Sequence, residues 1–328
     1  EGTAGLVVTE KNANGEDVLY KYEQYYDAEN GDSLVLTIDV NIQHYLEQAL
    51  EDAVEKYDVS NGATGIVMNV KTGAILAMAS LPNFDLNDPR TIYDENLAAQ
   101  LVGLEGHAYQ EKLGELQLLQ WRNKAINDTY EPGSTFKILT LAMALEEDLI
   151  DESSTFNCAG HINVEGWPKP MYCSKRAGHG QQTLAQAVAN SCNPAFIQIG
   201  LKVGTDKYYQ YVSDFGLLDT TGIDLQGEGK GIFFDEEEFG KNVVSLASAA
   251  FGQTFNVTPI ALITAEAAAV NGGYLYEPYL VQQVLDSDGD VVYEHDSTPV
   301  RQVISEETSE RVCALLEGVV DGGTGKNA

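Results

Sequence analysis

The stretch EPGSTFK, residues Glu131 to Lys137, runs directly into the apolar segment Ile138 to Leu145. The Pro-Gly pair before that segment predicts the start of a helix, with Ser134 in its first turn. Ser134 and Lys137 are three residues apart, so they lie on one face of the helix. In a poorly hydrated pocket, a neutral Lys137 would be able to deprotonate Ser134. The alternative is a helix-capping serine beside a surface lysine.

A second pair of polar residues follows at Ser191-Cys192-Asn193. It lies between two predicted helices, and Pro194 opens the second of them. A hydroxyl and an amide presented at such a corner would relay a proton and hold a peptide. Alone, this tripeptide is more often an ordinary helix cap. Its order and spacing after EPGSTFK favour a catalytic pair of motifs.

The rest of the chain alternates helical and strand patterns. Asp39 is a predicted N-cap of an amphipathic helix that reaches Tyr57, and residues 81–130 are a long excursion with helix around Glu95 to Gln120. A hairpin is predicted across Tyr279 to Tyr293, turning at Asp288-Gly289. Further helices are predicted at Phe136 to Glu146, Leu184 to Ala189, Pro194 to Val203, Lys207 to Phe215, Ile260 to Asn271 and Ser305 to Val320.

The two motifs together resemble the transpeptidase domain of the penicillin-binding proteins. The resemblance covers nearly the whole chain, and the chain is similar in pattern to the class B, monofunctional penicillin-binding proteins. The segments that carry this similarity are LTIDVNIQHYLEQAL, AILAMASLPNFD, NSCNPAFIQIG and FGQTFNVTPIALITAEAAAVNGG. It implies an α+β fold with a helical subdomain and a central antiparallel sheet. It also implies a transpeptidase domain at residues 34–328, with residues 1–33 as a remnant of, or linker from, an N-terminal pedestal domain.

The resemblance also implies a reaction. A stem peptide ending in D-Ala-D-Ala acylates Ser134, the terminal D-Ala leaves, and the acyl group passes to a neighbouring peptide's amine; β-lactams acylate the same serine. Lys137 activates Ser134, and Ser191 passes a proton toward the leaving amine. Asn193 hydrogen-bonds Lys137 or the substrate backbone, and the Ser134 N–H forms half of the oxyanion hole. No cofactor and no metal are implied.

The family has a third motif, a Lys-Thr/Ser-Gly strand, after the Ser-x-Asn motif. Nothing after Asn193 matches it, because the late segment Thr324-Gly325-Lys326 has the wrong order. We therefore expect a C-terminally truncated domain with an incomplete sheet, which alone acylates slowly or not at all. The earlier Lys71-Thr72-Gly73 precedes both motifs and separates two short apolar runs, which predicts a hairpin turn with Gly73 at positive φ.

Two other interpretations compete with a transpeptidase. A non-catalytic scaffold or β-lactam sensor would keep the same fold, although the intact Ser134, Lys137, Ser191 and Asn193 argue against decay. A class D β-lactamase also uses Ser-Thr-Phe-Lys, but that family has Ser-x-Val in place of Ser-x-Asn. A role in division, elongation or sporulation is left open.

The composition of the chain limits which kinds of partner it can bind. Nineteen basic residues against fifty acidic residues give a net charge of -31, which argues against a nucleic-acid partner. No apolar run approaches the roughly 20 residues of a membrane helix. The chain has no initial Met, so it reads as an excerpt of a longer protein. By resemblance, an absent N-terminal anchor would hold it at the outer face of the cytoplasmic membrane, near a cell-wall polymerase partner.

The four cysteines are too few for a disulfide scaffold. Cys158 and Cys173 fall in one loop, where a disulfide is favoured and would imply an oxidising compartment. Free thiols are the next alternative, and zinc held with His161 or His179 is the least favoured, because the spacing matches no standard finger. The remaining two, Cys192 and Cys313, are expected to be small buried residues.

Overall fold

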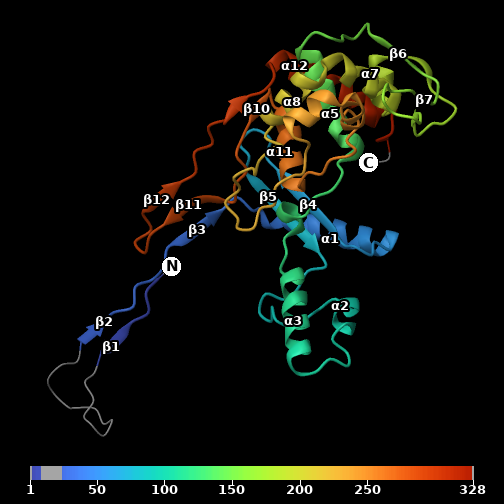
Figure 1. The fold of residues 1–328 in the computed structure, drawn as a ribbon. Coiled ribbons are helices and arrows are strands. Elements are labelled where there is room, and N and C mark those ends of the chain that lie inside the picture. The colour runs from blue at the N-terminus through green and yellow to red at the C-terminus, as the bar shows by residue number, and fades with distance from the viewer. Residues whose placement is uncertain (1, 9–23, 327–328) are drawn as a thin grey trace. The chain divides into compact units, whose positions relative to one another are not determined.

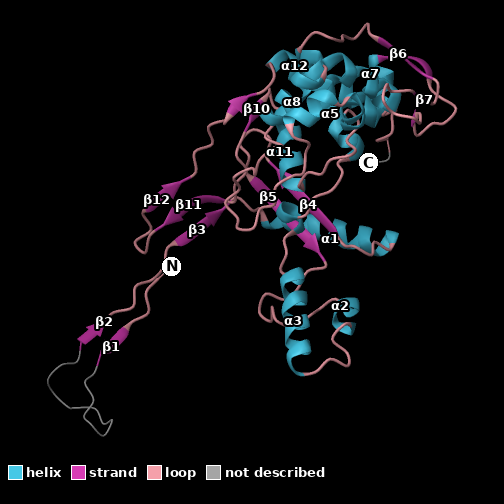
Figure 2. Cartoon of the chain, in the orientation of Figure 1, coloured by secondary structure: helices cyan, strands magenta, loops and turns pink. Residues whose placement is uncertain are grey.

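The structure is a computed structural model, and it describes residues 2–8 and 24–326. Contacts divide the chain into two compact units (Figure 1). The first unit comprises Glu1–Thr37 and Tyr279–Asp296, and the second comprises Ile38–Pro278 and Ser297–Ala328. Helices and strands both contribute, as Figure 2 shows, so the predicted α+β class is confirmed. The predicted domain boundary near residue 34 stays a prediction.

The first unit is built from antiparallel strands. One pair joins β1 (Leu6–Val8) to β2 (Gln24–Tyr26). A three-stranded sheet has the order β12-β11-β3, with bounds β3 Ser33–Leu36, β11 Val281–Leu285 and β12 Val291–Glu294. The predicted hairpin between β11 and β12 is confirmed: the Asp286 carboxylate accepts from the backbone N–H groups of Asp288 and Asp290, and Gly289 has φ +88°. Such Asx-type contacts are typical of tight turns.

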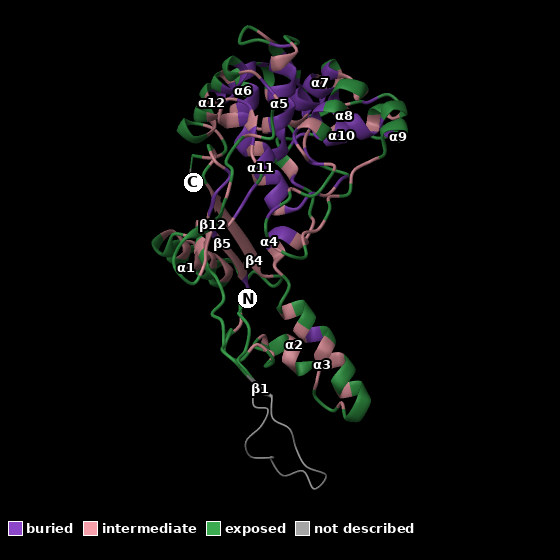
Figure 3. Ribbon diagram, turned by 90° about the vertical axis from the view of Figure 1, so that its left-hand side faces the viewer, coloured by how far each residue is buried: buried purple, intermediate pink, exposed green. Residues whose placement is uncertain are grey.

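The core of the second unit surrounds α5 (Lys137–Glu146). Its sequence KILTLAMALE is apolar on nearly all sides, and Leu139 through Leu145 are at most 1% exposed, as expected for a helix covered by other elements. Three helices pack directly on it: α7 (Asn193–Val203), α11 (Pro259–Val270) and α12 (Glu306–Asp321). Figure 3 shows the buried residues gathered in α5, α7 and α11.

Further helices complete this core. The predicted α6 and α8 are present, and α10 packs on α7 although no pattern predicted it. The bounds are α6 Leu184–Ala189, α8 Thr205–Asp214, α9 Glu236–Lys241 and α10 Val243–Ala249. Short paired strands flank the helices: β6 Thr155–Cys158 with β9 Gly180–Thr183, β7 His161–Ile162 with β8 Met171–Tyr172, and β10 Tyr274–Leu275 with β13 Arg301–Gln302.

An antiparallel hairpin lies against α11 and α1. It consists of β4 (Ala63–Met68) and β5 (Ile75–Leu81), and α1 (Val40–Tyr57) packs mainly on β5. Asp39 caps α1 as predicted, with its carboxylate accepting from two backbone N–H groups. Gln43 of α1 exchanges two 2.9 Å hydrogen bonds with the backbone of Met78 on β5. These contacts fix the helix on the strand.

The excursion after β5 contains α2 (Glu95–Ala99), α3 (Gly106–Gln120) and α4 (Lys124–Asn127). The helix predicted around Glu95 to Gln120 is therefore confirmed as two separate helices. Of the α3 residues only Leu116 is buried. Within residues 2–8 and 24–326, every helix is too short or too polar to cross a membrane.

Candidate active site

The turn that carries Ser134 is fixed by a neighbouring loop. Ser134 lies in a short 3-10 helix, η1 (Gly133–Phe136), which leads straight into α5. The Gly133 N–H donates to the Gly252 carbonyl at 2.8 Å. A Cβ on Gly252 would lie 2.0 Å from the Gly133 oxygen, so only glycine permits this approach. Phe136 is fully buried against Phe255, which anchors the other end of the turn.

Lys137 is the centre of the site. Its side chain is only 4% exposed, although Ser134 beside it is exposed. The Nζ atom donates to Ser134 Oγ at 3.1 Å and to Asn193 Oδ1 at 2.8 Å. It also lies 2.9 Å from both the carbonyl oxygen and the Oγ of Ser191. The structure thus brings the other three predicted site residues together around the Lys137 amine.

The Ser-Cys-Asn corner presents its side chains through an unusual backbone. Ser191 has φ +46°, in the left-handed region that residues other than glycine seldom adopt. This turn between α6 and α7 points both Ser191 oxygens at Lys137. Asn193 begins α7, and its Nδ2 donates to the Tyr172 carbonyl at 3.1 Å, which fixes the orientation of the amide. Strained positions of this kind concentrate at functional sites.

The burial of Lys137 shifts its amine toward the uncharged form. Burial lowers the pKa of Lys137 to about 8, while the nearby Cys192 and Cys173 act in the opposite direction. Desolvation penalises the ammonium form because water no longer surrounds the charge. A lysine with a lowered pKa is the expected partner of a nucleophilic serine.

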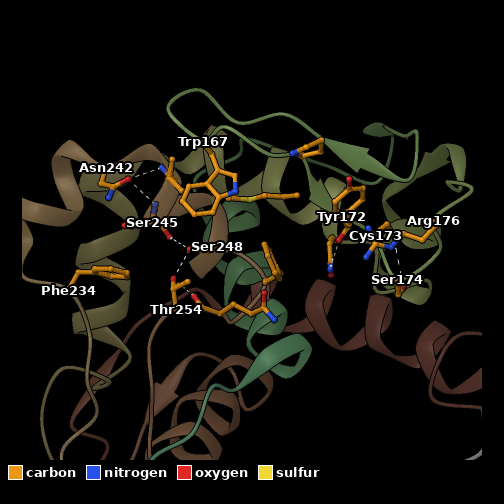
Figure 4. A pocket seen from close by; sticks show the side chains of 16 residues that line it. Trp167, Tyr172, Cys173, Ser174, Arg176, Phe234, Asn242, Ser245, Ser248 and Thr254 are labelled. Carbon is orange, nitrogen blue, oxygen red and sulfur yellow. Dashed lines mark hydrogen bonds between the residues drawn. The ribbon is translucent and has the colours of Figure 1, made fainter.

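Two cavities lie at the site. The smaller, of about 250 Å³, is lined by Ser134, Lys137 and Ser191, with Leu316 and Val319 of α12 on its apolar side. The larger, of about 750 Å³, shares only Asn193 with the predicted site residues. Figure 4 shows its lining, with Trp167 and Asn242 on one side and the Tyr172–Arg176 segment on the other. The reacting atoms border the smaller cavity, and the larger one offers room for a bound chain beside Asn193.

The tripeptide Lys71-Thr72-Gly73 is a turn, as predicted. It connects β4 to β5, and Gly73 has φ +80°. The Asn69 side chain accepts from the Lys71 N–H at 3.0 Å, and Lys71 is exposed. A Cβ at Gly73 would lie 2.5 Å from the Glu277 carbonyl oxygen, so the glycine serves packing as well as the turn. None of the three residues lines the cavity that contains Ser134.

All four cysteines are free thiols, so the favoured disulfide between Cys158 and Cys173 is wrong in this structure. Cys192 is fully buried, which agrees with its prediction, whereas Cys313 is only half-buried.

Glu266 of α11 is a half-buried acid that no motif marks. Its Oε1 is buried and has no hydrogen-bond partner among the residues that the structure describes. Burial raises the pKa of Glu266 to about 7, and the Thr135 hydroxyl of the nucleophile turn opposes this shift in part. Burial and the charge of Glu266 both raise the pKa of Tyr130. A lone acid inside the alanine-rich stretch TAEAAA was the available sequence signal.

Replacing Glu266 with glutamine is expected to stabilise the protein more at pH 8 than at pH 5. Because the folded-state pKa is raised, the folded protein holds this proton more tightly than the unfolded chain. The contribution of Glu266 to stability is therefore present below about pH 4.5 and is lost as the pH rises through about 7. Glutamine does not titrate and avoids that loss. We therefore expect the gain in the free energy of unfolding from Glu266→Gln to be larger by about 2 kcal/mol at pH 8 than at pH 5.

Urea unfolding of the Glu266→Gln variant and the parent at both pH values measures the difference. Glu51→Gln, which changes an exposed carboxyl on α1, is the matched control and should shift stability equally little at both. An equal gain at pH 5 and pH 8 for Glu266→Gln would show that Glu266 does not carry the buried proton.

Comparisons with known proteins agree with this geometry. A sequence model of the family described as "Penicillin binding protein transpeptidase domain" matches residues 63–328. Stage V sporulation protein D of Bacillus subtilis is 39% identical over 330 residues, covering 100% of this chain and 47% of that protein. The chain spans about half the length of the curated relatives it matches.

Solved structures show the same fold. Penicillin-binding protein 3 of Mycobacterium tuberculosis, complexed with aztreonam, has a TM-score of 0.75 at 25% identity, covering 92% of this chain and 62% of that chain. The D,D-transpeptidase domain of a peptidoglycan glycosyltransferase from Eggerthella lenta has a TM-score of 0.73 at 26% identity, covering 98% and 80%. With a family match over most of its length, the chain belongs to the penicillin-binding protein transpeptidase family and is homologous to the class B penicillin-binding proteins.

Proposed function

We propose that this chain carries the acyl-transfer site of a peptidoglycan D,D-transpeptidase and is a target of β-lactams. Ser134 is the nucleophile and Lys137 its general base. Ser191 carries a proton to the leaving group, and Asn193 holds Lys137 in position. The observation that supports this proposal is the set of four hydrogen-bonding contacts around the Lys137 Nζ.

The four oxygens around Lys137 are of two kinds. The Ser191 carbonyl oxygen and Asn193 Oδ1 can only accept hydrogen bonds, whereas the hydroxyls of Ser134 and Ser191 can also donate. A neutral amine has two N–H groups and one lone pair. When the two obligate acceptors take the two N–H groups, the lone pair is left for a hydroxyl. Lys137 is then arranged to remove the Ser134 proton.

The first half-reaction forms an acyl-enzyme. The Ser134 oxygen attacks the carbonyl between the two D-alanines of a stem peptide while Lys137 takes its proton. The Ser134 backbone N–H donates to the oxyanion that forms. Ser191 then delivers its proton to the nitrogen of the leaving D-alanine and takes the proton held by Lys137, and Ser134 remains as an ester.

The second half-reaction transfers the acyl group. An amine of a neighbouring stem peptide attacks the Ser134 ester, and its proton returns through the same groups, which regenerates the free serine. The site of this reaction is the outer face of the cytoplasmic membrane, where a cell-wall polymerase is the candidate partner. Because residues 194–328 contain no Lys-Thr-Gly, we expect a polypeptide of residues 1–328 alone to acylate slowly.

A fluorescent penicillin tests this function. Two polypeptides are compared, residues 1–328 alone and the same residues followed by a Lys-Thr-Gly strand. The expected result is an acyl adduct on the tryptic peptide Ala125–Lys137, formed faster in the second polypeptide. Absence of that adduct from both polypeptides would contradict the proposal. Acylation without transfer to a peptide amine would instead support the sensor, and rapid nitrocefin turnover would support a β-lactamase.

A further inference from the structure

Three thiols and one imidazole meet behind the Ser-Cys-Asn corner. The Sγ atoms of Cys158, Cys173 and Cys192 and a ring nitrogen of His179 all lie within 4.8 Å of one another. The three cysteines are at most 2% exposed. The Cys173 Sγ and the His179 Nδ1 are 3.6 Å apart. Four such ligand atoms, largely shielded from water and mutually this close, are the usual donor set of a structural zinc site.

The separation of the Cys173 and His179 ligand atoms fits a tetrahedral ion. With Zn–S near 2.3 Å and Zn–N near 2.0 Å, a tetrahedron separates sulfur from nitrogen by about 3.6 Å. This is the separation between Cys173 and His179. A disulfide would bring two sulfurs to about 2 Å and leave the third thiol and the imidazole without a role. A single ion uses all four groups.

The backbone around the cluster is shaped to bring the ligands together. Cys158 ends β6, and its partner in β9 is Gly180, the residue after His179. A Cβ on Gly160 would lie 2.0 Å from the Arg176 carbonyl oxygen, and one on Gly178 would lie 2.3 Å from the Cys158 carbonyl oxygen. These two glycines let the segments on either side of the loop approach closely, which places the first thiol beside the imidazole.

We propose that Cys158, Cys173, His179 and Cys192 bind one structural zinc ion. All four coordination positions are filled by the protein, so no position remains for water or substrate and the ion is not a catalytic one. The thiols release their protons on binding, and the three thiolates offset the charge of the ion.

The zinc ion acts as a positioning device for the catalytic corner. Cys192 lies between Ser191 and Asn193, and Cys173 follows Tyr172, whose carbonyl oxygen accepts from Asn193 Nδ2. One ion therefore ties the end of β8 to the start of α7, the two segments that orient the Asn193 amide. The binding of zinc does not depend on the proposed function. The positioning of Ser191 and Asn193 for catalysis, in contrast, rests on the proposed function.

Metal analysis of residues 1–328, purified without chelators, tests the proposal. We expect one zinc per chain by elemental analysis and native mass spectrometry. Replacement by Co²⁺ should give thiolate-to-cobalt charge-transfer bands in the near ultraviolet and strong visible bands of a tetrahedral site. His179→Gln changes a half-buried ligand and should raise the zinc Kd by more than about 100-fold. Loss of a residue that merely hydrogen-bonds a metal ligand already weakens metal affinity by about 10- to 100-fold, and His179 would bind the ion directly.

His161→Gln is the matched control, because His161 is an exposed histidine of the same loop that lies outside the cluster. It should leave the zinc Kd unchanged. A chelator should lower the thermal midpoint of the parent and of His161→Gln but have little effect on His179→Gln. Absence of bound zinc, cobalt spectra without thiolate bands, or a mass lower by two hydrogens that reports a disulfide would each overturn the proposal.

Discussion

Replacing Ser134 with alanine is expected to abolish covalent labelling by a fluorescent penicillin while leaving the fold intact. The alanine lacks the oxygen that forms the ester, so no acyl-enzyme can form at this position. The fold should persist because Ser134 is exposed and, among the residues that the structure describes, its hydroxyl hydrogen-bonds only Lys137, which keeps its other acceptors. Surface changes of this kind usually alter stability by less than about 0.5 kcal/mol.

Intact-mass spectrometry after long incubation measures the adduct, and thermal unfolding checks the fold. Ser153→Ala is the matched control, since it removes an exposed hydroxyl that donates a hydrogen bond to the Asp151 carboxylate. That variant should label at the parent rate. An adduct on the Ser134→Ala protein in the parent amount would show that another side chain is the nucleophile.

The site could be predicted in part because some of its geometry is local. Ser134 and Lys137 share a helical turn, so their spacing alone predicts a contact, and the structure has it at 3.1 Å. Ser191 and Asn193 lie 54 and 56 residues away from Lys137, and only the resemblance of two ordered motifs linked them to it. No sequence pattern indicated the left-handed backbone of Ser191, because such a conformation is imposed by the surrounding packing.

The cysteine cluster was predicted only in part: zinc held by Cys158 and Cys173 with His161 or His179 was the least favoured alternative, and Cys192 was not among the ligands, because the geometry of the cluster is not local. Its four ligands come from the end of β6, the residue after β8, the turn before β9 and the start of α7. Their spacing therefore follows the fold and matches no finger motif. The prediction that Cys192 is a small buried residue is confirmed for its burial, but it does not mention the two thiols and the imidazole that lie beside it. Helix α10 was missed for a different reason: it is only seven residues long, and its five buried residues include both Ser245 and Ser248, so polar and apolar residues do not separate into two faces.

Replacing Lys137 with methionine is expected to slow acylation by about 10²- to 10⁴-fold, the usual worth of a general base. Methionine keeps the length and apolar stem of lysine, so the packing near Phe196 is retained. The variant loses the lone pair that would accept the Ser134 proton, while Ser134 itself stays in place. The rate of adduct formation with a fluorescent penicillin, measured in the polypeptide that includes a Lys-Thr-Gly strand, provides the test.

Lys71→Met is the matched control, because it makes the same chemical change in the exposed turn between β4 and β5. If Lys71-Thr72-Gly73 is only a turn, this variant acylates at the parent rate; if the tripeptide served as the third motif, acylation would fall. A Lys137→Met variant that acylates within tenfold of the parent would rule out Lys137 as the base. Unfolding curves of both variants separate chemistry from stability, since the Ser191 carbonyl and the Asn193 amide each lose a donor in Lys137→Met alone. A loss of rate without loss of structure would therefore assign the proton transfer to the amine at the centre of the four contacts.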